Sequence, residues 1–369
     1  MICNKYIVTL AACLSVSGVM SACGSKQKAG PQYKNVSRTK LKIVEDDEGN
    51  KSLVAVDEMT LAYEEVIERS PNVSSVTQIT RLQGAKSPGR IDVSSDGKSI
   101  VFQAFEKDRG VKSNLWRAST SGTGGISQIT AGNYYDMSPR YSTDGNRIYF
   151  SSNRNSLLPR IWSVRSSGAG GISMLTQSSS FDSNPSVSED GIVYFCSLPP
   201  HASAGQIWSI KSDGGHLTQL TEGVDPAISK DGSQLLYSSK DRDSGNWTLW
   251  SMTSDGLSPM QMTSPTEGNS RAASWSPNGE WIVYSSDRAK DNNGTQNYDI
   301  WIMDSDGSNK IQLTTNGSFD TLPVFGPNGK SVYFLSNRGF NWEVWKMNVE
   351  SVVSDNVTQA SAKKPSLVY

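Results

Sequence analysis

The sequence predicts an all-β protein, a six-bladed β-propeller with four-stranded blades, from three observations. Six Asp-Gly or Asn-Gly pairs align at a regular spacing, with their glycines 48, 46, 41, 47 and 50 residues apart. Each pair precedes an apolar strand, such as RIYFSS at 147–152, and then a second strand that contains Trp. Five copies end in a short strand of the type SQIT. A period in the forties with four strands in each copy is typical of propeller blades.

The six turn pairs predict where the first hairpin of each blade lies. Asp-Gly and Asn-Gly readily adopt the positive φ angles of a two-residue hairpin loop. We therefore expect such hairpins at Asp96-Gly97, Asp144-Gly145, Asp190-Gly191, Asp231-Gly232, Asn278-Gly279 and Asn328-Gly329. The recurring Trp is large, so we expect it in the core between adjacent blades, at Trp116, Trp162, Trp208, Trp250, Trp301 and Trp345.

Both ends of the repeat region carry a candidate strand for closing the ring. VTQIT at 76–80 precedes the first blade but has the pattern of an outer strand, which predicts pairing with the last blade around 330–348. SDNVTQA at 354–360 has a similar pattern and is the alternative. We expect the propeller to span 75–360, followed by a tail at 361–369.

The segment before the ring divides into a tether and two short elements. Residues 23–40 are polar and contain Gly, Lys, Gln and Ser, as in a flexible tether. Within 41–74 we expect a hairpin around Glu48-Gly49-Asn50 and a short helix over 57–69. The apolar face of this helix is expected to pack on the propeller, with docking on a partner as the alternative.

The first 22 residues have the pattern of a secretory signal peptide. They carry a lone Lys5, an apolar run from Ile7 and no carboxylate. Their end, Met20-Ser21-Ala22-Cys23, resembles a bacterial lipobox, which implies that Cys23 carries lipid, including fatty acyl chains such as palmitate. An ordinary cleavage site with a stray Cys is the alternative. Because Gly24 follows rather than Asp, we expect an anchor in the outer membrane, facing the periplasm.

Composition excludes one large class of partners. Lys and Arg number 35 against 36 Asp and Glu, for a net charge of −1. Without a basic block the chain has no electrostatic affinity for a phosphate backbone, so nucleic acid is not expected as a partner. Beyond Cys23 the only cysteine is Cys196, so we expect no internal disulfide and a buried thiol.

The segment SPNGEWIVYSSDR…YDIWIMDSDGSNKIQLT at 276–314 resembles the repeat of the TolB-like six-bladed propellers. The resemblance extends over about 75–360 and implies a periplasmic module for protein–protein interaction. TolB itself has an α/β domain before its propeller and no lipid anchor. The sequence therefore resembles a lipoprotein with a TolB-like propeller rather than TolB itself.

One face of the predicted propeller carries loops of variable length, between the second and third strands of each blade. They lie at 105–113, 153–160, 197–206, 239–246, 287–298 and 337–342. Variable loops on a fixed scaffold are the usual place for recognition. The candidate partner-binding residues are Arg154, Arg160, His201, Asp241, Arg242, Asp287, Arg288 and Arg338 in this rim, together with Asp136, Asp182 and Asp320.

An Asp also recurs ahead of the inner strands. It is found at Asp136, Asp182, Asp225 and Asp320, while an Arg recurs in the rim at Arg154, Arg288 and Arg338. Repetition in successive blades favours a structural pairing or loop cap. The alternative is a polar ring at the mouth of the central channel that grips a peptide.

Candidate catalytic and metal-binding residues are scarce. The two histidines, His201 and His216, are not in a metal-ligand spacing, and no G-x-S-x-G motif is present. Asp241-x-Asp243-x-Gly245 imitates the start of a calcium loop, but its twelfth position is Met252 rather than Glu. We therefore expect no metal and no cofactor.

The sequence thus favours a non-enzymatic, lipid-anchored interaction scaffold, an accessory subunit of a larger envelope assembly. Its expected partner is an envelope protein or a peptide segment that docks on the loop-rich face. A polysaccharide lyase is one alternative. A glycan-binding propeller is another, using rim aromatics such as Tyr134, Tyr135 and Tyr298.

Overall fold

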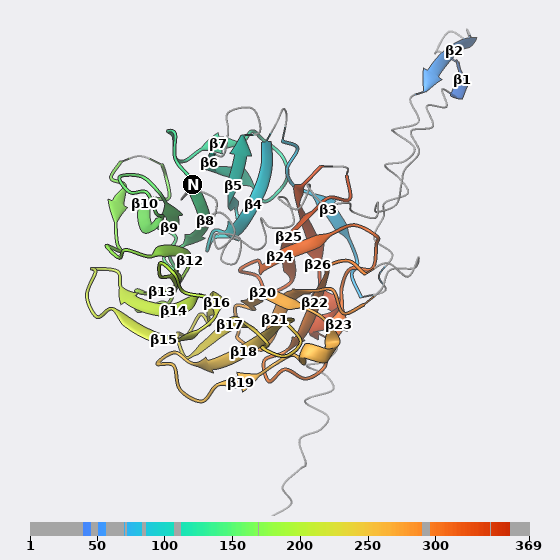
Figure 1. Ribbon diagram of the computed structural model, residues 1–369. Helices are drawn as coiled ribbons and strands as arrows, with labels where there is room; N and C mark the ends of the chain where they lie inside the picture. Colours follow the sequence, from blue (N-terminus) through green and yellow to red (C-terminus); the bar gives the residue numbers. More distant parts are fainter. Residues whose placement is uncertain are drawn as a thin grey trace, which may run out of the picture.

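The computed structural model describes residues 40–45, 51–56, 70, 72–82, 86–106, 112–168, 170–289, 296–339 and 341–354. Six four-stranded antiparallel sheets follow one another around a ring, as Figure 1 shows. This confirms the predicted six-bladed propeller. In these ranges, helix is confined to a 3₁₀ turn at Pro265–Glu267 and a segment at 350–354, and no helix has the length and apolar character needed to cross a membrane.

Each blade runs from an inner strand at the channel to an outer strand at the periphery. Blade 1 consists of β4 (Lys86–Val93), β5 (Ser99–Glu106), β6 (Ser113–Ser119) and β7 (Ser127–Gln128). Blade 2 consists of β8 (Asp136–Tyr141), β9 (Arg147–Ser152), β10 (Arg160–Arg165) and β11 (Ser173–Met174). Blade 3 consists of β12 (Phe181–Val187), β13 (Ile192–Leu198), β14 (Gln206–Lys211) and β15 (Thr218–Glu222). Blades 4 and 5 consist of β16 (Val224–Ile228), β17 (Gln234–Lys240), β18 (Trp247–Thr253) and β19 (Met260–Gln261), and of β20 (Ser270–Trp275), β21 (Trp281–Ser286), β22 (Asp299–Asp304) and β23 (Ile311–Gln312).

Blade 6 joins the two ends of the ring. It contains β24 (Asp320–Phe325), β25 (Ser331–Ser336), β26 (Glu343–Asn348) and, as its outer strand, β3 (Val76–Gln78). Beyond β3, Thr80 Oγ1 donates to Glu343 Oε2 at 2.5 Å, and the Leu82 amide donates to Glu343 Oε1 at 2.8 Å. The N-terminal candidate strand therefore closes the ring, while most of the competing segment, 355–360, lies outside the described residues.

The blade turns differ in type from the expected two-residue hairpins. In blade 1, Gly97 has a φ of 70°, but Asp96 is not among the residues with positive φ. The Gly97 amide donates to Ser94 O at 2.8 Å, and the Ser94 amide donates to Ser99 O at 2.8 Å. This is a longer loop in which Gly97 is the left-handed residue, so the expected turn type was wrong although the position was right.

The Asp of each such turn has a local structural role. Asp96 Oδ1 accepts from Ser94 Oγ at 2.6 Å and from the Lys98 amide at 3.0 Å. The hydrogen bond from Ser94 is the largest cause that lowers the pKa of Asp96. Ser142 with Asp144 and Ser229 with Asp231 repeat the arrangement.

Every inner strand contains a β-bulge at the same position. In five blades the bulge places a residue other than Gly at positive φ: Ser138 at 51°, Asn184 at 52°, Asp225 at 57°, Ala272 at 53° and Leu322 at 55°. In blade 1 the bulge spans Gly89 and Arg90. A bulge re-aims side chains, and here it places polar groups of the inner strands in the channel.

The core lies between neighbouring blades. Trp162 of blade 2 clusters with Val101 and Leu115 of blade 1, which confirms the expected packing at this Trp position. Cys196 is fully buried, as predicted.

Only part of the segment before the ring is described. β1 (Lys40–Glu45) pairs with β2 (Lys51–Val56), which confirms the predicted hairpin. The expected helix over 57–69 lies outside the described residues.

Candidate functional site

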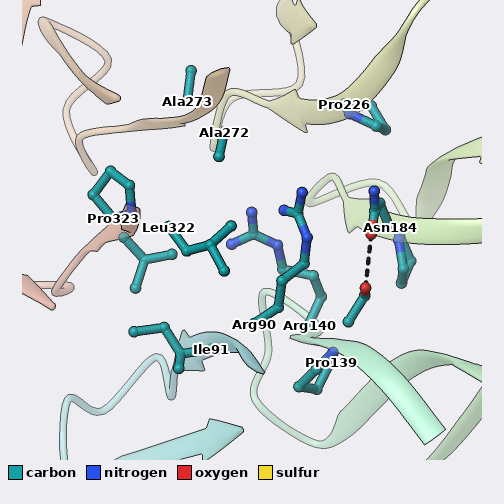
Figure 2. A pocket seen from close by; sticks show the side chains of 13 residues that line it. Arg90, Ile91, Pro139, Arg140, Asn184, Pro226, Ala272, Ala273, Leu322 and Pro323 are labelled. Carbon is teal, nitrogen blue, oxygen red and sulfur yellow. Dashed lines mark hydrogen bonds between the residues drawn. The ribbon is translucent and has the colours of Figure 1, made fainter. Parts of the chain in front are cut away.

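The central channel is narrow and polar at the level of the bulges. A cavity of about 20 Å³ is lined there by residues from all six inner strands. Figure 2 shows Arg90 and Arg140 pointing into this space, opposite Pro226 and Ala272. The channel is therefore filled largely by side chains at this level.

A network around Asp225 crosses the channel. Arg90 Nη2 of blade 1 forms an ion pair with Asp225 Oδ1 of blade 4, and Arg271 Nη2 of blade 5 pairs with Asp225 Oδ2 at 2.7 Å. Asn184 Nδ2 donates to Asp225 Oδ1 at 2.9 Å. Ser138 Oγ donates to Asn184 Oδ1 at 2.7 Å, which is the dashed bond at Asn184 in Figure 2. Blades 1 to 5 are thus connected through one carboxylate.

Electrostatics keep this carboxylate ionised. Burial opposes the charge of Asp225, but Arg271 and Arg90 outweigh that effect and hold its pKa below the usual value. Burial lowers the pKa of Arg90 in turn. The recurring Asp in the sequence predicted that Asp225 is equivalent to Asp136 and Asp182. This prediction was wrong. Asp225 occupies the bulge, two residues further along the strand than the other carboxylates.

The predicted pairing of recurring Asp and Arg is confirmed in blades 2 and 6. Arg154 Nη2 lies 2.5 Å from Asp136 Oδ2, and Arg338 Nη2 lies 2.6 Å from Asp320 Oδ2. Ser152 Oγ accepts from Arg154 Nε at 3.0 Å, and the same bond is repeated at Arg338. All four charged side chains are buried. The two ion pairs hold the bases of the rim loops in place. Because these side chains are buried, they do not form the contact surface for a partner that the sequence predicted.

Asp182 and Arg288 depart from this pairing. Asp182 is also fully buried but accepts from Ser178 Oγ and Ser197 Oγ at 2.7 Å each, and burial raises its pKa. Arg288 is half-buried, stacks 4.7 Å above the Trp301 ring and pairs with Glu267 at 3.4 Å, because blade 5 has Ser270 where blade 2 has Asp136.

The remaining rim candidates reach the surface to different extents. His201 and Arg242 are exposed, while Arg160, Asp241 and Asp287 are half-buried. Arg160 Nη1 donates to Ser180 O at 2.6 Å. Asp287 holds the connection before β20 by accepting from the Asn269 amide at 2.6 Å. Of these five candidates, the two exposed side chains therefore belong to the loops of blades 3 and 4.

Leu157 was not among the predicted partner-binding residues, because only charged residues and a histidine were selected. Its loop, 153–160, was included in the rim. Its side chain is 93% exposed at the tip of the β9–β10 loop. The base of the same loop is held by the buried Arg154–Asp136 pair. The only signal in the sequence was a Leu pair inside an otherwise polar loop, SNRNSLLPR.

The rim aromatics are mostly structural. Arg154 lies 4.7 Å above the Tyr134 ring, Tyr135 packs on a core cluster, and burial raises the pKa of Tyr298 to about 12. Asp241 accepts from the Ser244 amide at 2.8 Å, which closes its loop locally. Within the described ranges, no group of three His, Cys, Asp or Glu could hold a metal ion. The lipidation candidate Cys23 lies outside these ranges.

Comparison with known proteins gives a family match and a relative. The model of the TolB beta propeller domain matches residues 57–278. An uncharacterised protein of Agrobacterium fabrum is 28% identical over 138 residues, which is 37% of this chain and 44% of that protein. The matched stretch thus spans less than half of that relative.

Two solved structures are similar in fold. One is the Agrobacterium tumefaciens protein assigned as a TolB, with a TM-score of 0.54, 19% identity and coverage of 74% of this chain and 96% of that one. The other is the oligogalacturonate lyase of Vibrio parahaemolyticus, with a TM-score of 0.52, 13% identity and coverage of 76% and 95%. At these identities the likeness concerns the fold alone.

Proposed function

The chain belongs to the TolB beta propeller domain family, and from this membership we propose that it is a non-enzymatic scaffold for protein–protein interaction. The proposed partner is an envelope protein, or a peptide segment of one, that docks on the loop-rich face. Lipid on Cys23 would hold the scaffold at the periplasmic face of the outer membrane. It would act there as an accessory subunit of a larger envelope assembly.

Rigid display is the physical basis of this proposal. The single observation that carries it is the β9–β10 loop, whose base is fixed by the buried Arg154–Asp136 pair while Leu157 is 93% exposed at its tip. A loop that is ordered before binding loses less conformational entropy on association. The exposed His201 and Arg242, on the next two blades, extend the same surface.

The alternative of a polysaccharide lyase or glycan-binding propeller has one supporting observation, the fold shared with an oligogalacturonate lyase. Lyase chemistry needs a base and usually a metal. In the described part of the chain, His201 is exposed on the rim and no three potential ligands converge. The residues present therefore favour the scaffold.

A crosslinking pull-down of the lipidated protein from its own cell envelope tests the proposal. The test variant is Leu157→Asp with Arg242→Glu, which changes two exposed side chains and leaves the buried ion pairs intact. Arg165→Glu is the matched control, because Arg165 is exposed at the end of β10 on the opposite, hairpin face. We expect a discrete partner with wild type and Arg165→Glu, and its loss with the double variant.

Two further measurements separate the alternatives. Cys23→Ala should move the protein from the membrane fraction to the soluble periplasmic fraction. Incubation with acidic polysaccharides, followed by the ultraviolet absorbance of unsaturated products, tests for a lyase. A partner that survives the double variant would exclude this rim as the interface, and accumulating unsaturated product would replace the scaffold by an enzyme.

A further inference from the structure

One face of the propeller carries the hairpins between the first and second strands of each blade, and we call it the hairpin face. On this face the channel opens into a larger space, which we call the vestibule. It has a volume of about 220 Å³ and is lined by the ends of all six inner strands and the turns that follow them. Arg140 borders both the vestibule and the narrow level of the channel. The vestibule lies on the face opposite the rim loops, so it is distinct from the proposed partner surface.

Positive charge accumulates along this axis. Among the described residues, Arg140 and Lys230 line the vestibule with Asp92 as the one carboxylate of its lining, and below them Arg90 and Arg271 both pair with Asp225. Four cations against two carboxylates leave an excess of two positive charges, although the chain as a whole has a net charge of −1. Low-dielectric walls focus such a field and raise the local concentration of anions.

Arg140 is the group that can receive an anion. Its Nη1 donates to Asp92 Oδ1 at 3.2 Å, and 20% of its side chain remains exposed. A guanidinium has five N–H donors, and its planar geometry matches a carboxylate. Asp92 also accepts from the Tyr141 amide at 2.7 Å, so this carboxylate has a partner besides Arg140. Figure 2 shows the Arg140 side chain within the channel beside Arg90.

The rest of the vestibule wall offers contacts to a hydroxylated carbon skeleton. Trp275 and Phe325 contribute aromatic surface, and the Trp275 ring is fixed because its Nε1 donates to Ala227 O at 3.0 Å. Ser95, Thr143 and Ser274 line the same space and can donate to or accept from ligand hydroxyls. Aromatic surface with convergent polar groups is the usual composition of a small-ligand site.

We propose that the vestibule binds a small hydroxylated carboxylate of the sugar-acid type, with its carboxylate on Arg140 and its ring against Trp275. The volume of about 220 Å³ equals roughly seven water molecules at about 30 Å³ each. This suits a single sugar acid rather than a polymer chain. The site would let a soluble anion bind while the rim face engages its protein partner.

Isothermal titration calorimetry of the full chain with D-glucuronate and with D-glucose tests the proposal. The two sugars differ only at C6, where glucuronate has a carboxylate and glucose has a hydroxymethyl group. We expect saturable binding of glucuronate and at least about tenfold weaker binding of glucose, since a hydrogen bond to a charged group contributes enough for such a factor. Arg140→Gln should weaken glucuronate binding about tenfold. Arg165→Gln, on an exposed Arg outside the channel, should leave it unchanged.

Two further variants with opposite expected effects distinguish a lost binding site from a misfolded protein, because misfolding can only weaken binding. Lys230→Gln removes an exposed charge and should weaken binding by a few-fold, whereas Asp92→Asn removes the opposing carboxylate and should strengthen it. No binding of glucuronate, equal binding of both sugars, or glucuronate binding that is unchanged in Arg140→Gln and Lys230→Gln would overturn the proposal. A tetra-alanine acid that binds more tightly than its C-terminal amide, in the absence of glucuronate binding, would overturn the sugar-acid assignment in favour of a peptide C-terminus.

Discussion

Blades 2 and 3 bury the same carboxylate at the start of their inner strands but stabilise it by different means. Asp136 pairs opposite Ser152, and Asp182 opposite Ser197, in the same register. Two residues after these serines, blade 2 has Arg154 and blade 3 has Pro199. Asp136 therefore has a guanidinium at 2.5 Å, whereas the described contacts of Asp182 are hydroxyl groups. The strand position sets the burial, and one loop residue decides whether the charge is compensated.

The largest effect should come from breaking the ion pair of blade 6, which is of the same type as that of blade 2. Arg338→Met leaves Asp320 buried without its guanidinium, and we expect a loss of about 3–5 kcal/mol in the free energy of unfolding. Urea denaturation measures it. In the double variant Arg338→Met with Asp320→Asn the loss should be clearly smaller, because the uncompensated charge is then gone. Equal losses in both variants would mean that packing rather than charge explains the effect.

Blade 3 should differ through pH dependence. Because burial raises the pKa of Asp182 above the unfolded value, near 3.9, folding favours its protonated form. The contribution is complete below about pH 4 and is lost as the pH rises through the folded-state pKa. Asp182→Asn should therefore flatten the fall in unfolding free energy between acidic and neutral pH. A profile parallel to that of wild type would show that Asp182 does not titrate in this way.

The smallest effect is expected in blade 5, where the rim Arg is half-exposed. Arg288→Gln removes the 3.4 Å pair with Glu267 and the stacking on Trp301. Such pairs and stacks contribute about 1 kcal/mol or less at partly exposed sites. The part of this loss in unfolding free energy that comes from the ion pair should become smaller in high salt, because salt screens exposed charges. A loss as large as that of Arg338→Met would remove the distinction between buried and exposed rim arginines.

The fold could be predicted because its signals are local and repeated. The six aligned Asp-Gly or Asn-Gly pairs mark turns, and their similar spacing indicates six blades. The closing strand at 76–78 was also readable, since it has the pattern of an outer strand without a blade of its own. The turn type was not readable, because a left-handed Gly ends several kinds of hairpin.

The candidate site was predicted less well, since it depends on register and on contacts across the ring. Asp225 follows the same visible pattern as Asp182, yet the bulge places it two residues further along its strand, in the channel. Its partner Arg90 is 135 residues away in sequence. Arg154 and Arg338 have the composition of surface loops, and only the position of their Asp partners makes them buried.

The way in which blade 6 is completed has a consequence for biosynthesis. β3 leaves the ribosome before any blade, but its partner β26 is synthesised after nearly all of the others. Thr80 and Glu343, which lie next to this junction, are separated by 263 residues. During folding, the other five sheets can form while β3 remains an unpaired strand. Pairing of β3 with β26 converts a row of blades into a closed ring, and it can occur only after β26 has been synthesised.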